Sequence, residues 1–138
     1  MASFVYNSFW EDLARGNVDL DTNTFRMMLV TSSYVPDKDT HAKRSSVTNE
    51  ISATGYTAKG PTVTFTITQD AATDRISYTL SSASLASFTG TSRRAIYYRD
   101  RGGASSADEL IACNDFGADV TYTAATMSVA AFNIRVQN

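Results

Sequence analysis

The stretch that decides the fold lies in the middle of the chain and reads TVTFTITQDAATDRISYTL from Thr62 to Leu80. Apolar residues alternate with polar ones in both of its halves, at Val63, Phe65 and Ile67 and again at Ile76, Tyr78 and Leu80. Alternation with a period of two is the pattern of a β-strand that has one buried and one solvated face. Turn-forming residues occupy 70–74 between the halves. The stretch therefore predicts an antiparallel β-hairpin.

Short strands are also expected on both sides of this hairpin. The run from Thr24 to Thr31 is dense in apolar residues and predicts a strand that is buried on most sides. Further on, the expected elements are a short strand or bend at 83–88, strands at 94–99 and 109–114, a turn at 115–119, a brief strand at 120–123, and a last strand at 127–136 with a bulge between Val129 and Phe132. About seven or eight short strands predict an all-β fold, an antiparallel jelly roll or sandwich.

The N-terminal segment 1–16 predicts the one short helix. Ser8 and Glu11 have the spacing of a capping box, Phe9 and Leu13 share one face, and Gly16 suits a left-handed helix end. A helix this short is marginal alone, so its aromatic face is expected to dock on the body or on a partner.

The composition agrees with a β-rich chain. The 138 residues contain 18 Thr and 16 Ser but only 3 Lys and 3 Glu. Threonine favours strands, whereas lysine and glutamate favour helix surfaces. The length predicts one domain over 1–138, in which the irregular stretch 32–61 is expected to form a long contact loop.

Composition also excludes several classes of function. With one histidine, His41, and one cysteine, Cys113, the chain cannot supply a zinc site of four His or Cys ligands or an internal disulfide. Cys113 is expected to be a small buried apolar residue. No apolar run approaches the length of ~20 residues that spans a bilayer, and no export signal is seen at the N-terminus. A net charge of -2 argues against nucleic acid as a partner.

Two polar clusters have spacings that suggest chemistry. Asp19, Asp21 and Asn23 have the spacing that opens a calcium loop, but Thr24 and Val30 stand where that loop needs Gly and Glu, so a turn is expected instead.

The second cluster surrounds His41, which lies close to Asp37 and Asp39. The chain has no Gly-x-Ser-x-Gly motif that would present a nucleophilic serine to this histidine. We therefore expect no enzyme activity, no metal and no cofactor.

An arginine-rich stretch is the one part of the sequence in which charged residues follow a regular pattern. Arg93, Tyr97, Arg99 and Arg101 have the same parity, so a strand places them on one face, opposite Ile96 and Tyr98. The stripe is either an ordinary solvated face or a contact strip for an acidic partner, since Arg and Tyr are favoured at interfaces. Single-stranded nucleic acid is a weaker third candidate.

Several strings resemble a family of small virion proteins of tailed bacteriophages. They are YNSF at 6–9, EDLA at 11–14, VDLDT at 18–22, MLVTSSY at 28–34, NE at 49–50, GYT at 55–57, Gly60 and DFG at 115–117. The family includes the capsid cement, or decoration, protein of a short-tailed Bordetella phage.

This resemblance implies a jelly-roll protein, made in the host cytoplasm, that binds the capsid exterior as a homodimer. The major capsid protein is then the partner. The expected contact residues are Phe4, Tyr6, Phe9, Trp10, Tyr34, Tyr56, Arg93, Tyr97, Arg99 and Arg101. A tail or neck protein is the structural alternative. A carbohydrate-binding module that uses exposed aromatics such as Tyr97 is the alternative from another class.

Overall fold

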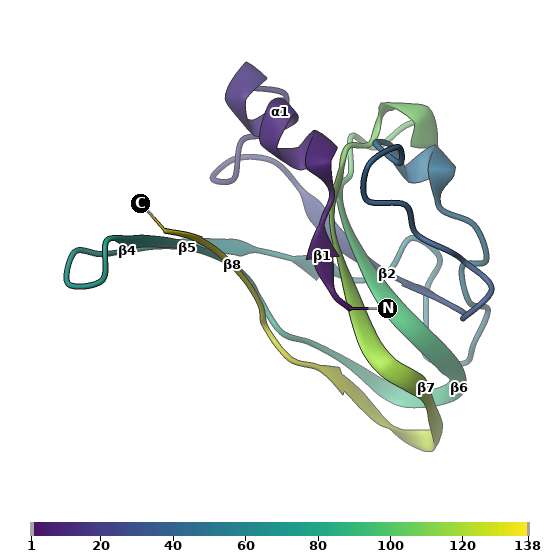
Figure 1. Ribbon diagram of the computed structural model, residues 1–138. Helices are drawn as coiled ribbons and strands as arrows, with labels where there is room; N and C mark the ends of the chain where they lie inside the picture. Colours follow the sequence, from purple (N-terminus) through teal and green to yellow (C-terminus); the bar gives the residue numbers. More distant parts are fainter. Residues whose placement is uncertain (1, 138) are drawn as a thin grey trace.

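The computed structural model describes residues 2–137 and shows two antiparallel β-sheets with one α-helix (Figure 1). One sheet has the strand order β1-β7-β6-β2-β3 and the other has the order β4-β5-β8. The strands are β1 (Phe4–Val5), β2 (Phe25–Val30), β3 (Thr62–Val63), β4 (Phe65–Asp70), β5 (Arg75–Leu80), β6 (Ala83–Arg99), β7 (Leu110–Val129) and β8 (Phe132–Gln137). The helix α1 is Asn7–Arg15, and single 3₁₀ turns are η1 (Arg44–Ser46) and η2 (Ser105–Ala107). This confirms the all-β prediction and is consistent with a sandwich.

The predicted hairpin is formed by β4 and β5. Its pairing runs without interruption from Phe65↔Leu80 to Asp70↔Arg75, and β8 pairs with the other side of β5. The carboxylate of Asp70 accepts a hydrogen bond from the Ala72 N–H at 3.0 Å, which closes the turn. The prediction missed one detail: the strand breaks at Thr64, so that Val63 belongs to β3 and pairs with Phe25 of β2.

The prediction of many short strands between 83 and 129 was wrong. The chain here forms two long strands, β6 and β7, which pair along their length. The expected turn at 115–119 lies inside β7, where Gly117 has a φ of 85°. Ser87 in β6 and Ala124 in β7 also have positive φ values, 52° and 46°. Each irregularity shifts the register and interrupts the period of two, so the sequence pattern resembles strand ends.

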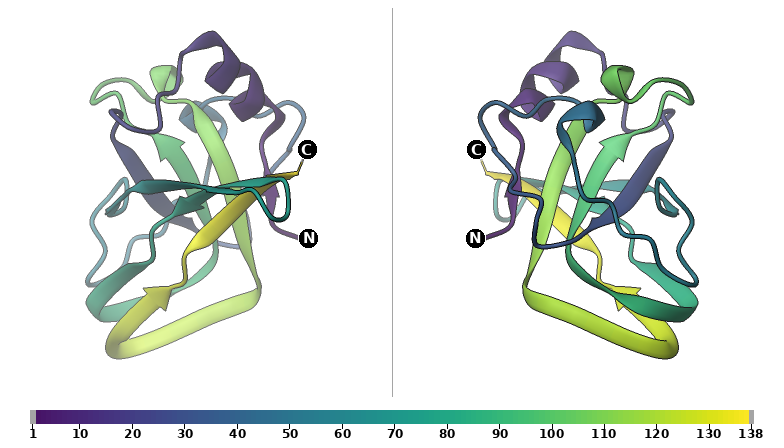
Figure 2. Two further views of the ribbon diagram at one scale, coloured as in Figure 1. Left: turned by 90° about the vertical axis from the view of Figure 1, so that its left-hand side faces the viewer. Right: turned by 90° about the vertical axis from the view of Figure 1, so that its right-hand side faces the viewer.

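The β6–β7 ribbon connects the two sheets. Its distal half, 83–92 paired with 120–129, curves away from the five-stranded sheet toward the start of β8 and the end of β5 (Figures 1 and 2). The predicted bulge after Val129 is instead the break between β7 and β8, where the chain passes from one sheet to the other.

Two apolar clusters cover the two faces of the five-stranded sheet. The larger cluster includes Phe9, Leu29 and Tyr97 from the helix and the five-stranded sheet, together with Leu80 and Ile134 of the three-stranded sheet. The second cluster lies on the opposite face and is built from residues of β2, β6 and β7 with Tyr6 and Tyr34. The second half of β6, from Ser92 to Tyr98, therefore has little solvated surface.

The helix ends as predicted but begins differently. Gly16, with a φ of 79°, donates its N–H to Leu13 O and closes the C-terminus. The predicted capping box does not form, because Tyr6 is the N-cap and Ser8 is already inside the helix. Hydrogen bonding of the Tyr6 N–H to Ile111 O, at 3.0 Å, places Tyr6 at the end of β1 and starts the helix there. Glu11 instead pairs with Arg15.

Candidate contact surface

The three-stranded sheet has one apolar and one polar face. Antiparallel pairing places directly opposed residues on the same face, so the rows across β4, β5 and β8 alternate between the two faces. The rows on the apolar face are Phe65–Leu80–Phe132, Ile67–Tyr78–Ile134 and Gln69–Ile76–Val136, in which Gln69 is the one polar residue. The polar rows are Thr66–Thr79–Asn133, Thr68–Ser77–Arg135 and Asp70–Arg75–Gln137.

Burial of the apolar face decreases toward the hairpin tip and toward the edge strand β4. Leu80 is 0% exposed and Ile134 is 3% exposed, because they pack in the larger cluster. Ile67, in the same row as Ile134 but on β4, is 46% exposed, and Val136, in the row nearest the tip, is 40% exposed. The hairpin projects from the body here (Figure 1). We call Ile67, Gln69, Ile76, Tyr78 and Val136 the distal apolar face.

Two shallow hollows adjoin the distal apolar face. One is lined by Ile67 and Tyr78 together with Leu13 of the helix and Val18 and Leu20 of the segment that follows it. The other lies nearer the tip and is lined by residues that include Ile76 and Val136. The first is also lined by Asp19 and Asp21, and the second by Asp70, Asp74 and Arg75. Both hollows therefore offer apolar walls with a polar rim to a partner side chain.

The predicted aromatic contacts of the N-terminal segment are largely internal. Tyr6 and Phe9 are both 0% exposed, since Phe9 packs in the larger cluster and Tyr6 in the second. Phe4 is half-buried and packs edge-on against Tyr6. Trp10, at 38% exposed, is the one of these four that presents a large part of its side chain to solvent.

The predicted contact loop 32–61 lies against the five-stranded sheet. Tyr34 is 1% exposed, and its hydroxyl lies 3.0 Å from that of Tyr6 and 2.9 Å from Nδ1 of His41. Burial raises the pKa of Tyr34 to about 12 and that of Tyr6 further still. These tyrosines therefore hold the loop on the sheet as neutral groups and are not accessible to a partner.

Tyr56 at the far end of the loop also has an internal role. Its hydroxyl donates to the Glu50 carboxylate at 2.6 Å and accepts the N–H of Leu29 at 3.2 Å. Burial and the Glu50 contact raise the pKa of Tyr56. The tyrosine thereby ties the loop to strand β2, and its ring is only half-buried.

The predicted outward arginine stripe is wrong in its geometry. Tyr97 is 0% exposed and packs on Phe132 in the larger cluster, because β6 is central in its sheet and both faces are covered. Arg93 donates from Nε to the Asp115 carboxylate at 3.1 Å, and Arg94 donates to the same group at 2.8 Å. A buried Tyr97 also cannot serve as the aromatic platform of a carbohydrate site.

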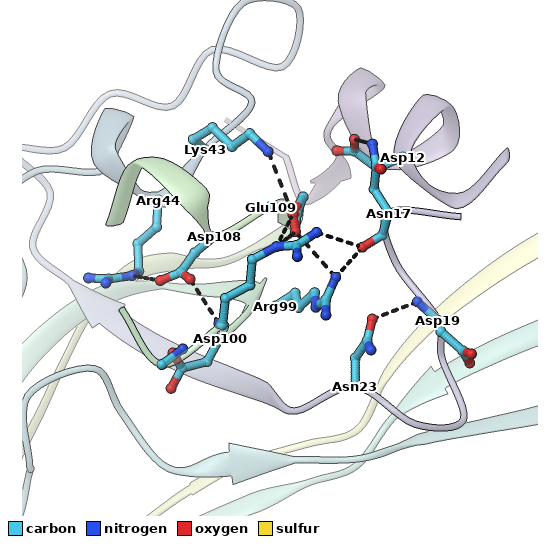
Figure 3. A network of polar contacts seen from close by, with 12 residues as sticks. Asp12, Asn17, Asp19, Asn23, Lys43, Arg44, Arg99, Asp100, Asp108 and Glu109 are labelled. Atoms are coloured by element: carbon cyan, nitrogen blue, oxygen red, sulfur yellow. Dashed lines mark hydrogen bonds and ion pairs between the residues drawn. The ribbon is translucent and has the colours of Figure 1, made fainter. Parts of the chain in front are cut away.

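Arg99, at the end of β6, and Arg101, just after it, belong to an ionic cluster around Glu109. Figure 3 shows Arg99 and Lys43 near Glu109 in this cluster. Arg101 Nε lies 2.7 Å from the carboxylate of Glu109, which is 0% exposed, and Arg99 and Lys43 approach the same carboxylate at 3.7 and 3.6 Å. Both arginines also donate to the carbonyl of Asn17. The cluster joins the long loop, the segment after the helix and the ends of β6 and β7.

The other polar clusters are also explained by folding. The Asp19 carboxylate accepts the N–H of Asp21 at 2.9 Å, and Asn23 accepts the N–H of Asp19, so the calcium-like spacing is a turn as predicted. Cys113 is buried as predicted, and burial raises the pKa of its thiol to about 12.

Within residues 2–137, no group of three or more His, Cys, Asp or Glu side chains is placed to hold a metal ion. No helix in this range is long and apolar enough to cross a membrane.

Sequence reasoning missed the distal apolar face as a candidate contact. Its signal was present in the alternation of the hairpin, because Ile67 and Ile76 belong to the same face as Leu80. The alternation does not show where the supporting body ends, and that boundary decides which apolar residues are left uncovered.

The chain was also compared with known proteins. No family model, no curated protein and no solved structure matches it. The resemblance of the quoted strings to phage virion proteins therefore stays a prediction.

Proposed function

We propose that this chain is a structural protein of a tailed-phage particle that binds the capsid exterior and reinforces the shell. The partners are the major capsid protein and a second copy of the chain. The quoted strings, concentrated in the first sixty residues, support the virion assignment. One structural observation supports binding as the mode of action: the distal apolar face, where Ile67 of the projecting hairpin is 46% exposed and Val136 of the neighbouring strand β8 is 40% exposed.

The physical basis of this function is burial of apolar surface against a preformed lattice. Each Å² of apolar area removed from water contributes roughly 25 cal/mol. Binding through a rigid β-sheet also avoids the ordering cost that a flexible loop would add. Many copies held on one shell, or a dimer that bridges two shell subunits, gain further affinity from a high effective concentration.

The test is binding to purified phage shells that lack this protein. Ile67→Glu places a charge in the proposed contact and is expected to abolish occupancy. Ser77→Glu is the matched control, because it adds the same charge to the polar face of the same sheet, in the row that contains Arg135. Full occupancy by the Ile67→Glu protein would remove the distal apolar face from the proposal.

Copy number separates the cement role from its structural alternative. A cement protein is expected in hundreds of copies per particle, whereas a tail or neck protein is expected in a dozen or fewer. Quantitative mass spectrometry of purified particles gives this ratio directly. A particle that contains none of the protein would overturn the virion assignment altogether.

A further inference from the structure

The edges of the two sheets differ in how they are protected from pairing with another strand. Natural β-proteins shorten their edge strands or place charges, proline or bulges on them. In the five-stranded sheet both edge strands, β1 and β3, are only two residues long. In the three-stranded sheet the edge strand β8 carries Arg135 near its centre. In the distal half of the β6–β7 ribbon, where neither strand has an outer neighbour, register shifts interrupt both edges.

The edge strand β4 lacks these protective features. It spans six residues, FTITQD, with no proline and no charge before Asp70 at its end. Its pairing with β5 is continuous, so no bulge twists the edge away. Residues 66–70 are all exposed, which leaves this edge open to another strand.

The phase of the β4–β5 ladder shows which backbone groups are free. The N–H of Ser81 donates to Thr64 O at 2.9 Å, so Thr64 and every second residue after it hydrogen-bond toward β5. The N–H and C=O groups of Phe65, Ile67 and Gln69 therefore point away from β5. Among the described residues, no hydrogen bond outside the β4–β5 pair uses these backbone groups.

We propose that β4 pairs antiparallel with β4 of a second copy of this chain, about a two-fold axis at Ile67. In this register Ile67 lies opposite its own copy, and Thr66 lies opposite Thr68 of the other chain. Asp70 lies opposite Thr64, so no like charges meet, and cross-strand threonine pairs are favourable. Pairing of two β8 strands about Arg135 would instead place two arginines opposite each other.

The consequence is one continuous sheet that carries two distal apolar faces side by side. This inference deepens the proposed function and rests on it for its biological setting, because a two-fold unit with a doubled apolar face binds a lattice bivalently. The pairing itself follows from the chain alone and is measurable without a shell.

Charge patterns on Thr66 and Thr68 test both the pairing and its register. Thr66→Lys with Thr68→Lys places lysine opposite lysine across the two-fold axis and is expected to weaken dimerisation about tenfold or more. Thr66→Lys with Thr68→Glu places each lysine opposite a glutamate and is expected to restore it. The matched control is Ser77→Lys with Thr79→Lys, which adds the same charges to the same face on the central strand β5.

Sedimentation equilibrium of the full chain over a wide concentration range gives the dimerisation constant, and circular dichroism checks that each variant is folded. A monomeric wild-type chain, or a double-lysine variant that dimerises as the wild type does, would overturn the inference. A Lys/Glu variant that remains monomeric would overturn it as well, because the register about Ile67 requires rescue. Shell occupancy is measured separately. If the wild-type chain dimerises but does not bind shells, the result counts only against the proposed function.

Discussion

The two sheets differ in how completely the chain covers them. The five-stranded sheet has an apolar cluster on each face, and its ion pairs are closed within the chain around Glu109 and Asp115. The three-stranded sheet has a solvated polar face and an apolar face that is covered only near the body. The comparison shows that charged and aromatic side chains concentrate where the chain closes on itself, whereas the threonine-rich β4–β5 hairpin leaves apolar side chains uncovered.

The largest expected loss of stability comes from adding a side chain at Gly60, where the long loop contacts the five-stranded sheet. Gly60 has a φ of 81°, and a Cβ there would lie 1.8 Å from Met27 O. Gly60→Ala is therefore expected to lower the free energy of unfolding by about 4 kcal/mol, since it combines backbone strain with a clash against β2. Urea denaturation measures the change.

Gly102→Ala is the matched control for this substitution. Gly102 has a φ of 85°, but a Cβ there would meet nothing within 4 Å. Only the backbone strain applies, so a loss of about 1 kcal/mol is expected. Equal losses at the two positions would mean that the loop is not held against the sheet in the way described.

Removing a carboxylate from the ionic cluster is expected to cost nearly as much. Glu109→Gln leaves Arg101, Arg99 and Lys43 without their shared partner at a position that is 0% exposed. The expected loss is about 3 kcal/mol, because Arg101 and Lys43 are partly exposed and can recover hydration. Glu11→Gln, which breaks the exposed pair with Arg15, is expected to have no measurable effect on the midpoint.

The dependence of stability on pH tests the other end of the same sheet. Burial acts to raise the pKa of Asp115, but the Gly117 N–H and the guanidinium groups of Arg93 and Arg94 outweigh it and hold the pKa below its ordinary value of 3.8. A lowered folded pKa means that the ionised group stabilises the fold above the unfolded pKa. This stability is lost as the pH falls from about 4 through the folded value.

Asp115→Asn should remove this part of the pH profile. The variant is expected to be about 2 kcal/mol less stable at pH 7, and the difference from the wild type should shrink as the pH falls below about 4. Urea denaturation at a series of pH values gives both curves. Parallel curves would show that the Asp115 carboxylate does not stabilise the fold through its ionised form.

The fold could be predicted from the sequence where a local pattern is regular. The hairpin was predicted because apolar residues alternate regularly in both of its halves, at Phe65 and Ile67 and again from Ile76 to Leu80, and the structure pairs the halves continuously. The long strands β6 and β7 were not predicted as such, because residues such as Ser87 and Ala124 take positive φ values inside them. Their continuity depends on pairing between distant segments, which local periodicity does not record.

The candidate site could be predicted only in part for the same reason. The parity of Arg99 and Arg101 is visible in the sequence, but the position of Glu109 on the neighbouring strand is a matter of register between distant segments. Likewise, the alternation identifies Ile67 as apolar-facing, but only the tertiary structure shows that the body ends before it. Contact residues were therefore assigned to aromatic segments that turned out to be internal.

Truncation of an apolar side chain is expected to reduce the free energy of unfolding least at the distal apolar face and much more in the five-stranded sheet. Leu29 is 0% exposed, so Leu29→Ala is expected to cost about 3 kcal/mol through lost burial and a cavity. Ile67 is 46% exposed, so Ile67→Ala is expected to cost less than about 1 kcal/mol. The proposed function predicts that the same Ile67 variant nevertheless loses shell occupancy, because the truncated area is apolar surface that the proposed contact would bury. An Ile67→Ala protein as destabilised as Leu29→Ala would mean that Ile67 serves the fold, and the contrast between the two sheets would disappear.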